Sequence, residues 1–329
     1  MITGASGGVG RAVARLYADR GANVALLARG EAGLEVASNE VTERGGRALA
    51  IPTDVSDADQ VEGAAARTEE EFGWIDVWIN VAMVTVLAKT WDVTPEEFRR
   101  VTEVNYLGAV HGTLAALKRM RPRDRGTILN VGSALAFRGI PLQAPYCASK
   151  AALENFGESL YTELLNEGSN VRFCEVHLPG LNTTQFIWGR NKTDKAPQPV
   201  PPMYQPEVAA RGIVWAADNG RRTTWVGAST PATIWGNRFF RGLVARNLAK
   251  SGIKKQKTDQ PASARPQDNL FQPQDQDIDR GSHGPFDDKA HEHSAFDIVS
   301  RNRGKIAAGA VAVLGAAAVV VAGRADHDT

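Results

Sequence analysis

The stretch TGASGGVG, residues 3–10, decides the fold of this chain. Gly4 permits a tight turn out of a strand, Gly8 lets the backbone approach a phosphate, and Gly10 lets the next helix pack against the sheet. The helical pattern VGRAVARLYADRG follows at once, and the free N–H groups at the start of such a helix suit a pyrophosphate. We therefore expect a phosphate-bearing ligand at this loop, and a glycine-rich turn without a ligand is the alternative.

The strand that should deliver this loop is almost absent. Only Met1 and Ile2 precede Thr3, although the strand should be central and flanked on both sides. Losing most of it removes several buried β-branched side chains, at ~1–3 kcal/mol each. We expect that the chain begins several residues too late, with a start codon assigned downstream; if the start is real, we expect a weakened fold.

Outward from the loop, short β-branched runs alternate with longer helical patterns as far as about residue 249. This alternation predicts an α/β, Rossmann-type doubly wound parallel sheet whose first strand is largely missing. One helix has a clear start, with Thr94 as N-cap, Pro95 at the first helical position and Glu97 completing a capping box. The predicted strands cover residues 23–28, 48–54, 76–82, 126–133, 170–180 and 223–227.

Composition narrows the class of protein. The chain has 329 residues, and 38 Lys and Arg nearly balance 37 Asp and Glu, so no global positive field points to nucleic acid. The two cysteines, Cys147 and Cys174, lack metal-like spacing, so we expect no metal site. Two cysteines in a chain of this length also fit a reducing compartment rather than a disulfide framework.

The end of the second predicted strand bears on the choice of dinucleotide. Ala28 cannot accept a hydrogen bond from an adenosine 2′-hydroxyl, and Arg29 can pair with a 2′-phosphate. These residues predict NADP(H), with NAD(H) as the alternative. Asp54, which ends the third predicted strand, is placed to meet the adenine, and a turn-forming aspartate is the competing interpretation.

Tyr146 and Lys150 stand four residues apart, on one face of a helix. A nearby cation stabilises a phenolate and lowers its pKa, so the pair suits acid–base chemistry on an alcohol or ketone. The pattern alone is weak, because a surface Tyr–Lys pair is the usual outcome. Ser133 ends a strand thirteen residues earlier and can donate a hydrogen bond to a substrate carbonyl. Asn105, inside the helix that begins at Pro95, can hold a water or a backbone group.

In their order these residues resemble the short-chain dehydrogenase/reductase family, over residues 1 to about 249. The resemblance implies that Tyr146 is the catalytic acid/base and that Lys150 binds the nicotinamide ribose and lowers the pKa of Tyr146. Ser133 would orient the substrate oxygen, and Asn105 would hold a water in a proton relay. The motifs that carry the resemblance are the TGxxxGxG loop, Asp54, Asn80, Asn105, Ser133, the YxxxK pair and Pro179-Gly180.

The same resemblance implies a cofactor site. Pro179 and Gly180, with Thr183 or Thr184 beyond them, would line its nicotinamide end. The implied cofactor-binding residues are Gly4, Ser6, Gly8, Val9, Gly10, Arg29, Asp54, Asn80, Tyr146, Lys150, Pro179, Gly180 and Thr183.

Two features depart from the family pattern. Met83 replaces a glycine that normally lets the backbone approach the cofactor, so we expect a reshaped cofactor wall. The basic residue that many NADP-dependent members carry in the glycine loop is also absent.

Three functions are compatible with these residues. The leading hypothesis is an NADP(H)-dependent oxidoreductase that interconverts a carbonyl and an alcohol of a small-molecule substrate. The alternative is a catalytically silent, membrane-tethered NADP-binding interaction or sensor protein. A sugar epimerase or dehydratase also uses a Tyr-x-x-x-Lys pair, but usually with a differently spaced glycine loop and a larger C-terminal domain.

Residues 182–206 contain five prolines and lie where the family places its substrate-covering segment. Their apolar side chains either cover the substrate or seal the loop onto the domain. These side chains are Phe186, Ile187, Trp188, Met203 and Tyr204.

The composition changes after residue 250, so we expect a catalytic domain over residues 1–250. Residues 251–304 are rich in Gln, Asp, Pro and Ser, which predicts a poorly ordered, low-complexity linker. We expect residues 305–324 to form a hydrophobic helix that spans the membrane or associates with it, because its uncharged core 306–323 would be ~27 Å long as a helix, near the thickness of a bilayer core. Basic residues before it predict a cytoplasmic catalytic domain anchored by this helix, and a helix packed on the membrane or on another subunit is the alternative. The family resemblance implies a homodimer or homotetramer.

Overall fold

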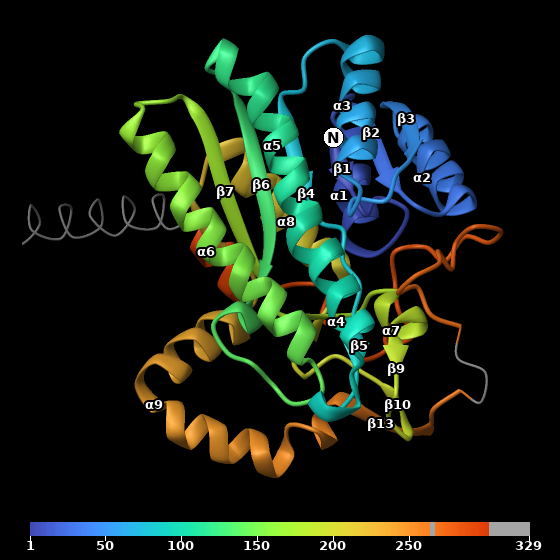
Figure 1. Ribbon diagram of the computed structural model, residues 1–329, viewed down its shortest axis with the longest axis vertical. Coiled ribbons are helices and arrows are strands. Elements are labelled where there is room, and N and C mark those ends of the chain that lie inside the picture. The colour runs from blue at the N-terminus through green and yellow to red at the C-terminus, as the bar shows by residue number, and fades with distance from the viewer. Residues whose placement is uncertain (264–266, 303–329) are drawn as a thin grey trace, which may run out of the picture.

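The computed structural model describes residues 1–263 and 267–302. Seven parallel strands form its main sheet, in the order β12-β7-β6-β4-β1-β2-β3 (Figure 1). This arrangement confirms the predicted α/β fold with a large parallel sheet. The strands are β12 (Thr223–Trp225), β7 (Val171–Leu178), β6 (Gly126–Ser133), β4 (Val77–Asn80), β1 (Ile2–Thr3), β2 (Asn23–Ala28) and β3 (Arg47–Pro52).

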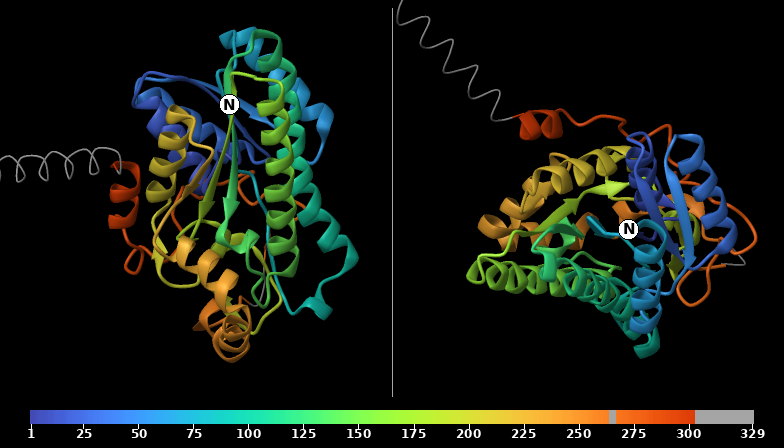
Figure 2. Two further views of the ribbon diagram at one scale, coloured as in Figure 1. Left: turned by 90° about the vertical axis from the view of Figure 1, so that its left-hand side faces the viewer. Right: turned by 90° about the horizontal axis from the view of Figure 1, so that it is seen from above.

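Helices cover both faces of the sheet (Figure 2). In most of these strands the side chains on both faces of the sheet are apolar, as expected for strands that are buried on both sides. On one face lie α1 (Gly8–Ala18), α2 (Glu31–Glu43) and α8 (Pro206–Asn219). On the other lie α3 (Ala58–Phe72), α5 (Gly108–Met120) and α6 (Ala144–Asn166).

Strand β1 is two residues long and still occupies the centre of the sheet. Ile2 pairs with Leu26 of β2 and with Ile79 of β4. The Thr3 hydroxyl accepts hydrogen bonds from the N–H groups of Val81 and Ala82, at 3.0 and 3.1 Å. These contacts place the glycine loop at the carboxyl edge of the sheet, where parallel α/β folds bind ligands.

The helix predicted to start at Pro95 begins there, as α4 (Pro95–Thr102), and the capping box of Thr94 and Glu97 is present. A π-helical turn, η2 (Glu103–Leu107), then interrupts it before α5. Such turns are rare inside helices and are frequent at functional sites. The turn carries Asn105, which was expected in a regular helix.

The remaining elements are short, apart from α9. They are β5 (Val86–Leu87), β8 (Gly180–Leu181), β9 (Arg190–Asn191), β10 (Lys195–Pro197), β11 (Met203–Tyr204), β13 (Lys257–Pro261), α7 (Gln185–Trp188), α9 (Ser229–Ser251), η1 (Thr90–Asp92), η3 (Arg121–Arg123), η4 (Ala134–Ala136) and η5 (Lys254–Gln256).

The segment expected to be a poorly ordered linker packs against the domain, which corrects that expectation. Its residues 267–283, here called the strap, run past α7 and the start of α2 (Figure 1). Leu270 is fully buried in the apolar cluster that contains Val55 and Val61, and Phe286 is buried further along. Few apolar side chains suffice because the polar ones pair with the domain, and these pairings were not visible in the composition.

No helix within residues 1–263 and 267–302 is long and apolar enough to cross a membrane. The predicted helix at residues 305–324 lies outside the described residues.

Candidate active site

One cavity of about 570 Å³ runs from the glycine loop to Tyr146. Among the predicted site residues, Gly10, Asn80 and Asn105 do not line it. Those that do are Gly4, Ser6, Gly8, Val9, Arg29, Asp54, Ser133, Tyr146, Lys150, Pro179, Gly180 and Thr183.

The glycine loop has the backbone that its sequence predicts. Gly4 and Gly8 have positive φ values of 66° and 52°, which a residue with a side chain rarely adopts. A Cβ on Gly4 would lie 2.8 Å from the Cα of Ala82, and one on Gly10 would collide with the Gly4 carbonyl oxygen. The loop therefore holds the start of α1 close against β1 and β4, with Gly8 and Val9 exposed to the cavity. This cradle of glycines at a helix N-terminus fits a dinucleotide pyrophosphate.

Asp54 lies in the cavity wall but its carboxylate already has partners. It accepts hydrogen bonds from the Ser56 N–H and hydroxyl, at 3.0 and 2.7 Å, and forms an ion pair with Arg100. Burial alone would raise the pKa of Asp54, but these contacts hold it below its usual value. The side chain therefore shapes the turn after β3, which the sequence offered as the competing interpretation.

Arg29 follows β2 as predicted, but its guanidinium is turned to the strap. It donates to the backbone carbonyls of Asn269, Leu270 and Phe271. Each of these partners lies about 240 positions further along the chain, so no local pattern indicated them.

Ser133, Tyr146 and Lys150 meet at the other end of the cavity. Ser133 ends β6, and its hydroxyl accepts the Leu135 N–H at 3.1 Å and contacts the Tyr146 phenol. The Lys150 ammonium lies 5.9 Å from the centre of the Tyr146 ring. Helix α6 thus places the phenol and the ammonium on one face, as the four-residue spacing predicts.

Burial dominates the electrostatics of this pair. It raises the pKa of Tyr146 to about 12, against a smaller lowering by the Ser133 hydroxyl. It also lowers the pKa of Lys150 to about 8. The family resemblance implies that Lys150 lowers the Tyr146 pKa, but here the Lys150 ammonium donates to the Val131 carbonyl at 2.7 Å. The phenol is therefore neutral at neutral pH.

The two asparagines outside the cavity hold its walls. The Asn105 side chain forms two hydrogen bonds with the backbone of Val84: it accepts from the N–H at 2.8 Å and donates to the carbonyl at 2.9 Å. Asn80 donates to the Asn130 side chain at 2.8 Å and accepts from the Trp78 indole at 2.8 Å. Both side chains connect strands and helices beside the cavity, and neither lines it.

The apolar side chains of residues 182–206 fall into three groups. Phe186 and Trp188 line the cavity, whereas Ile187 is exposed. Met203 and Tyr204 lie buried in β11 and seal the segment onto the domain. Met83, the departure from the family pattern, also lines the cavity.

Two parts of the cavity wall were not predicted from the sequence. Helix α9 contributes its inner face, including Val244 and Leu248. The strap contributes Asn269, Pro273 and Asp275. The change in composition at residue 250 placed the strap outside the catalytic domain, and only Leu270 and Phe271, isolated in a polar stretch, indicated that it could pack.

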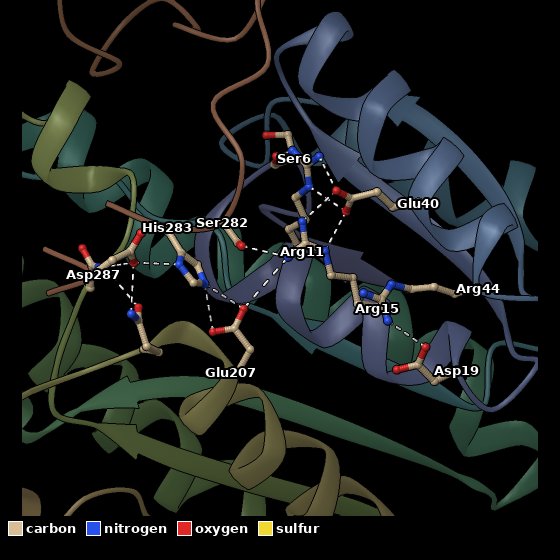
Figure 3. A network of polar contacts seen from close by, with 12 residues as sticks. Ser6, Arg11, Arg15, Asp19, Glu40, Arg44, Glu207, Ser282, His283 and Asp287 are labelled. Atoms are coloured by element: carbon tan, nitrogen blue, oxygen red, sulfur yellow. Dashed lines mark hydrogen bonds and ion pairs between the residues drawn. The ribbon is translucent and has the colours of Figure 1, made fainter. Parts of the chain in front are cut away.

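A buried network fixes the strap to α1 (Figure 3). Arg11 is 1% exposed, forms ion pairs with Glu40 and with Asp279 of the strap, and donates to the Ser6 carbonyl at 3.2 Å. Arg15 joins Glu40 at 2.7 Å and donates to Ser282 at 2.9 Å. The glycine loop and the strap thus share one set of partners.

A cluster of possible metal ligands lies away from this network. The sequence predicted no metal site. Glu154, Glu175 and His177 bring their ligand atoms within 4.8 Å of one another. The Arg222 guanidinium pairs with Glu175 at 2.7 Å and supplies the positive charge there. The cluster is therefore explained as an ion-pair network.

Comparisons with known proteins find relatives over much of the chain. A sequence model of the short chain dehydrogenase family matches residues 1–195. The uncharacterized oxidoreductase YxnA of Bacillus subtilis is 32% identical over 273 residues, 82% of this chain and 77% of that protein. The 2,3-dihydro-2,3-dihydroxybenzoate dehydrogenase of B. subtilis is 35% identical over 190 residues, 57% of this chain and 71% of that protein. Ketoacyl reductase HetN of Nostoc is 32% identical over 171 residues, 52% of this chain and 60% of that protein.

Proposed function

The chain belongs to the short-chain dehydrogenase family, whose members are NAD(P)-dependent oxidoreductases of CH–OH and C=O groups, and we propose that Tyr146 is its general acid/base. The observation that carries the proposal is the convergence of Ser133, Tyr146 and Lys150 on one cavity with the glycine loop. A bound nicotinamide dinucleotide would supply or accept the hydride. Residues of the glycine loop and Lys150 would hold it.

The protein's own part of the reaction is to hold and move a proton at the substrate oxygen. Tyr146 donates the proton of its phenol to a carbonyl oxygen, and its raised pKa keeps that proton in place at neutral pH. The Ser133 hydroxyl, in contact with the same phenol, donates a second hydrogen bond to the substrate oxygen. In the opposite direction Tyr146 takes the proton from an alcohol, which requires a lower pKa than burial alone gives.

The walls near Tyr146 support a substrate with an apolar body. Phe186, Trp188, Val244 and Leu248 line the cavity from the substrate-covering segment and α9. An aliphatic or aromatic carbonyl compound would bury its apolar part against them.

The preference for NADP(H) predicted from the sequence rested on two residues. Arg29 was expected to pair with the 2′-phosphate, but its guanidinium donates to three strap carbonyls. The prediction therefore rests on Ala28 alone, which cannot bind a 2′-hydroxyl.

Turnover of a panel of aldehydes, ketones and alcohols with NADH, NADPH and their oxidised forms tests the proposal. We expect the protein to reduce carbonyl compounds. The loss of absorbance of the reduced nicotinamide measures this reaction. The catalytically silent binding protein predicts nucleotide binding without turnover across the panel. Met83 and the tail are its only support, and the complete Ser133, Tyr146 and Lys150 set counts against it.

Membrane attachment through residues 306–323, a cytoplasmic catalytic domain and a homodimer or homotetramer stay predictions. Sedimentation with membranes of the full chain, compared with a chain ending at residue 304, tests the attachment. Light scattering on the shorter chain tests the oligomeric state.

A further inference from the structure

We propose that Asp275 of the strap selects the cofactor, by accepting a hydrogen bond from the adenosine 2′-hydroxyl of NAD(H) and repelling the 2′-phosphate of NADP(H). The inference rests on the proposed dinucleotide-dependent function and adds the residue that sets its specificity. The strap lies outside the region that matches the family model. Asp275 would there bind the 2′-hydroxyl, which Ala28 at the end of β2 cannot do.

The position of the carboxylate carries the argument. It lies at the start of α2, the helix that follows β2: a Cβ on Gly30 would collide with Oδ1 of Asp275, and one on Gly33 would lie 2.5 Å from Oδ2. In dinucleotide-binding folds the acid that binds the ribose 2′-hydroxyl stands at the end of the second strand. Asp275 therefore brings a carboxylate, from across the cavity, to the place where Ala28 lacks one.

The backbone of the strap fixes this position. The N–H groups of Ala32 and Gly33 donate to the carbonyls of Gln276 and Asp275, at 3.2 and 3.0 Å. On one side the Arg29 guanidinium binds the strap carbonyls from Asn269 to Phe271. On the other, the ion pair of Arg11 with Asp279 ties it to α1. Asp275 is thus held on both sides.

Within the described part of the fold, the carboxylate is not used as a hydrogen-bond acceptor. The strap carbonyls already cap the first N–H groups of α2, so the side chain is not needed as a cap. Among the residues that the structure describes, none donates a hydrogen bond to it, although Asp275 is only 5% exposed and lines the cavity. The nearby Arg29 guanidinium offsets part of its charge, and a ligand hydroxyl would supply the hydrogen bond that the fold does not.

The charges around Asp275 also favour NAD(H) over NADP(H). The carboxylate lies at the N-terminal, positive end of the α2 dipole. Arg29 is the neighbouring cation, but each of its terminal nitrogens already donates to carbonyl groups of the strap, which leaves it badly placed to bind a phosphate. A hydroxyl gains a charge-assisted hydrogen bond from Asp275, whereas a phosphate meets a like charge.

Binding of NADH and NADPH to the full chain without substrate tests the proposal. Calorimetry gives each Kd, and we expect NADH to bind about 10- to 100-fold more tightly, the range of one hydrogen bond to a charged group. Asp275→Asn removes the charge with little change in shape and should reduce the ratio of the two Kd values to about threefold or less. Asp275→Ser is the second variant, and thermal unfolding of each shows that it folds.

Asp277→Asn is the matched control, because it removes one negative charge from an exposed position two residues along the strap. It should leave the ratio unchanged. Tighter binding of NADPH by the natural chain, or an unchanged ratio in both Asp275 variants, would overturn the proposal. Equal weakening of both dinucleotides would also overturn it, since that result indicates a structural role. Failure of both dinucleotides to bind would refute the proposed function itself.

Discussion

Lys150 illustrates how burial sets the chemistry of one residue. Its ammonium is 4% exposed and donates to the Val131 carbonyl at 2.7 Å, a contact that keeps it in the cavity wall. Burial disfavours the charged form, so the pKa of Lys150 falls to about 8. The ammonium is therefore charged at neutral pH and loses its charge just above it.

This pKa predicts an alkaline limit to activity. Below about pH 8 Lys150 is charged and can hold the cofactor ribose, and above it the charge is lost, so carbonyl reduction should decline as pH rises through this value. Tyr146, with a pKa of about 12, does not limit activity in that range. A pH profile of kcat/KM measures this decline, which would form the alkaline limb of the profile.

Lys150→Arg is the informative comparison, because a guanidinium stays charged throughout this range. The variant should be slower, but its profile should lack the limb near pH 8. A limb at the same pH in both proteins would contradict the assignment to Lys150.

At the scale of elements, the Glu40 carboxylate of α2 pairs with Arg11 and Arg15 of α1, and these two arginines also bind the strap. Burial alone would raise the pKa of Glu40, but hydrogen bonds from Arg15 and Arg11 lower it to about 2. Because the pKa is lowered in the folded state, the contribution of Glu40 to stability is present above pH 4.5 and is lost as pH falls toward 2.

Glu40→Gln should therefore lower the free energy of unfolding by about 2–3 kcal/mol at pH 7, because it removes one of the two carboxylates that pair with the buried Arg11 guanidinium. The difference from the natural chain should shrink as pH falls from 4.5 to 2. Urea unfolding at several pH values measures both effects. Asp19→Asn, which breaks the exposed pair with Arg44 (Figure 3), is the control and should cost less than about 1 kcal/mol. Equal costs at the two sites would refute a special role for the network.

Leu270 anchors the strap to the domain. Replacing this fully buried side chain by alanine should cost about 2–5 kcal/mol of the strap's local stability and release it before the sheet unfolds. Limited proteolysis should then cut within residues 267–283 faster than in the natural chain.

Ile278→Ala provides the comparison, because this strap side chain is 53% exposed. It should leave the cleavage rate nearly unchanged. Equal protection of the natural and Leu270→Ala strap would show that Leu270 does not hold it.

For the whole molecule, the sequence predicts what depends on local pattern. The alternation of strands and helices gives the parallel sheet, the glycines of residues 3–10 give the loop at its carboxyl edge, and the four-residue spacing gives the common face of Tyr146 and Lys150. Each of these follows from contacts between residues close in sequence or from the repeat of a regular element.

What the sequence could not predict depends on contacts between distant residues. Arg29 looked free to bind a phosphate, because its carbonyl partners lie about 240 positions away. The partners of Asn80 and Asn105, on β6 and after β4, were likewise not visible in the sequence; their roles in the site stay predictions. The strap looked poorly ordered, because composition counts apolar side chains and not the arginines of α1 that pair with it.

Tyr146→Phe, with turnover and nucleotide binding measured on the same preparation, tests the central claim most directly. The variant keeps the ring that packs in the cavity and removes only the hydroxyl that moves the proton. We predict that carbonyl reduction falls by about 10²–10⁴-fold while the dinucleotide Kd stays nearly unchanged. Turnover close to that of the natural chain would contradict Tyr146 as the general acid/base.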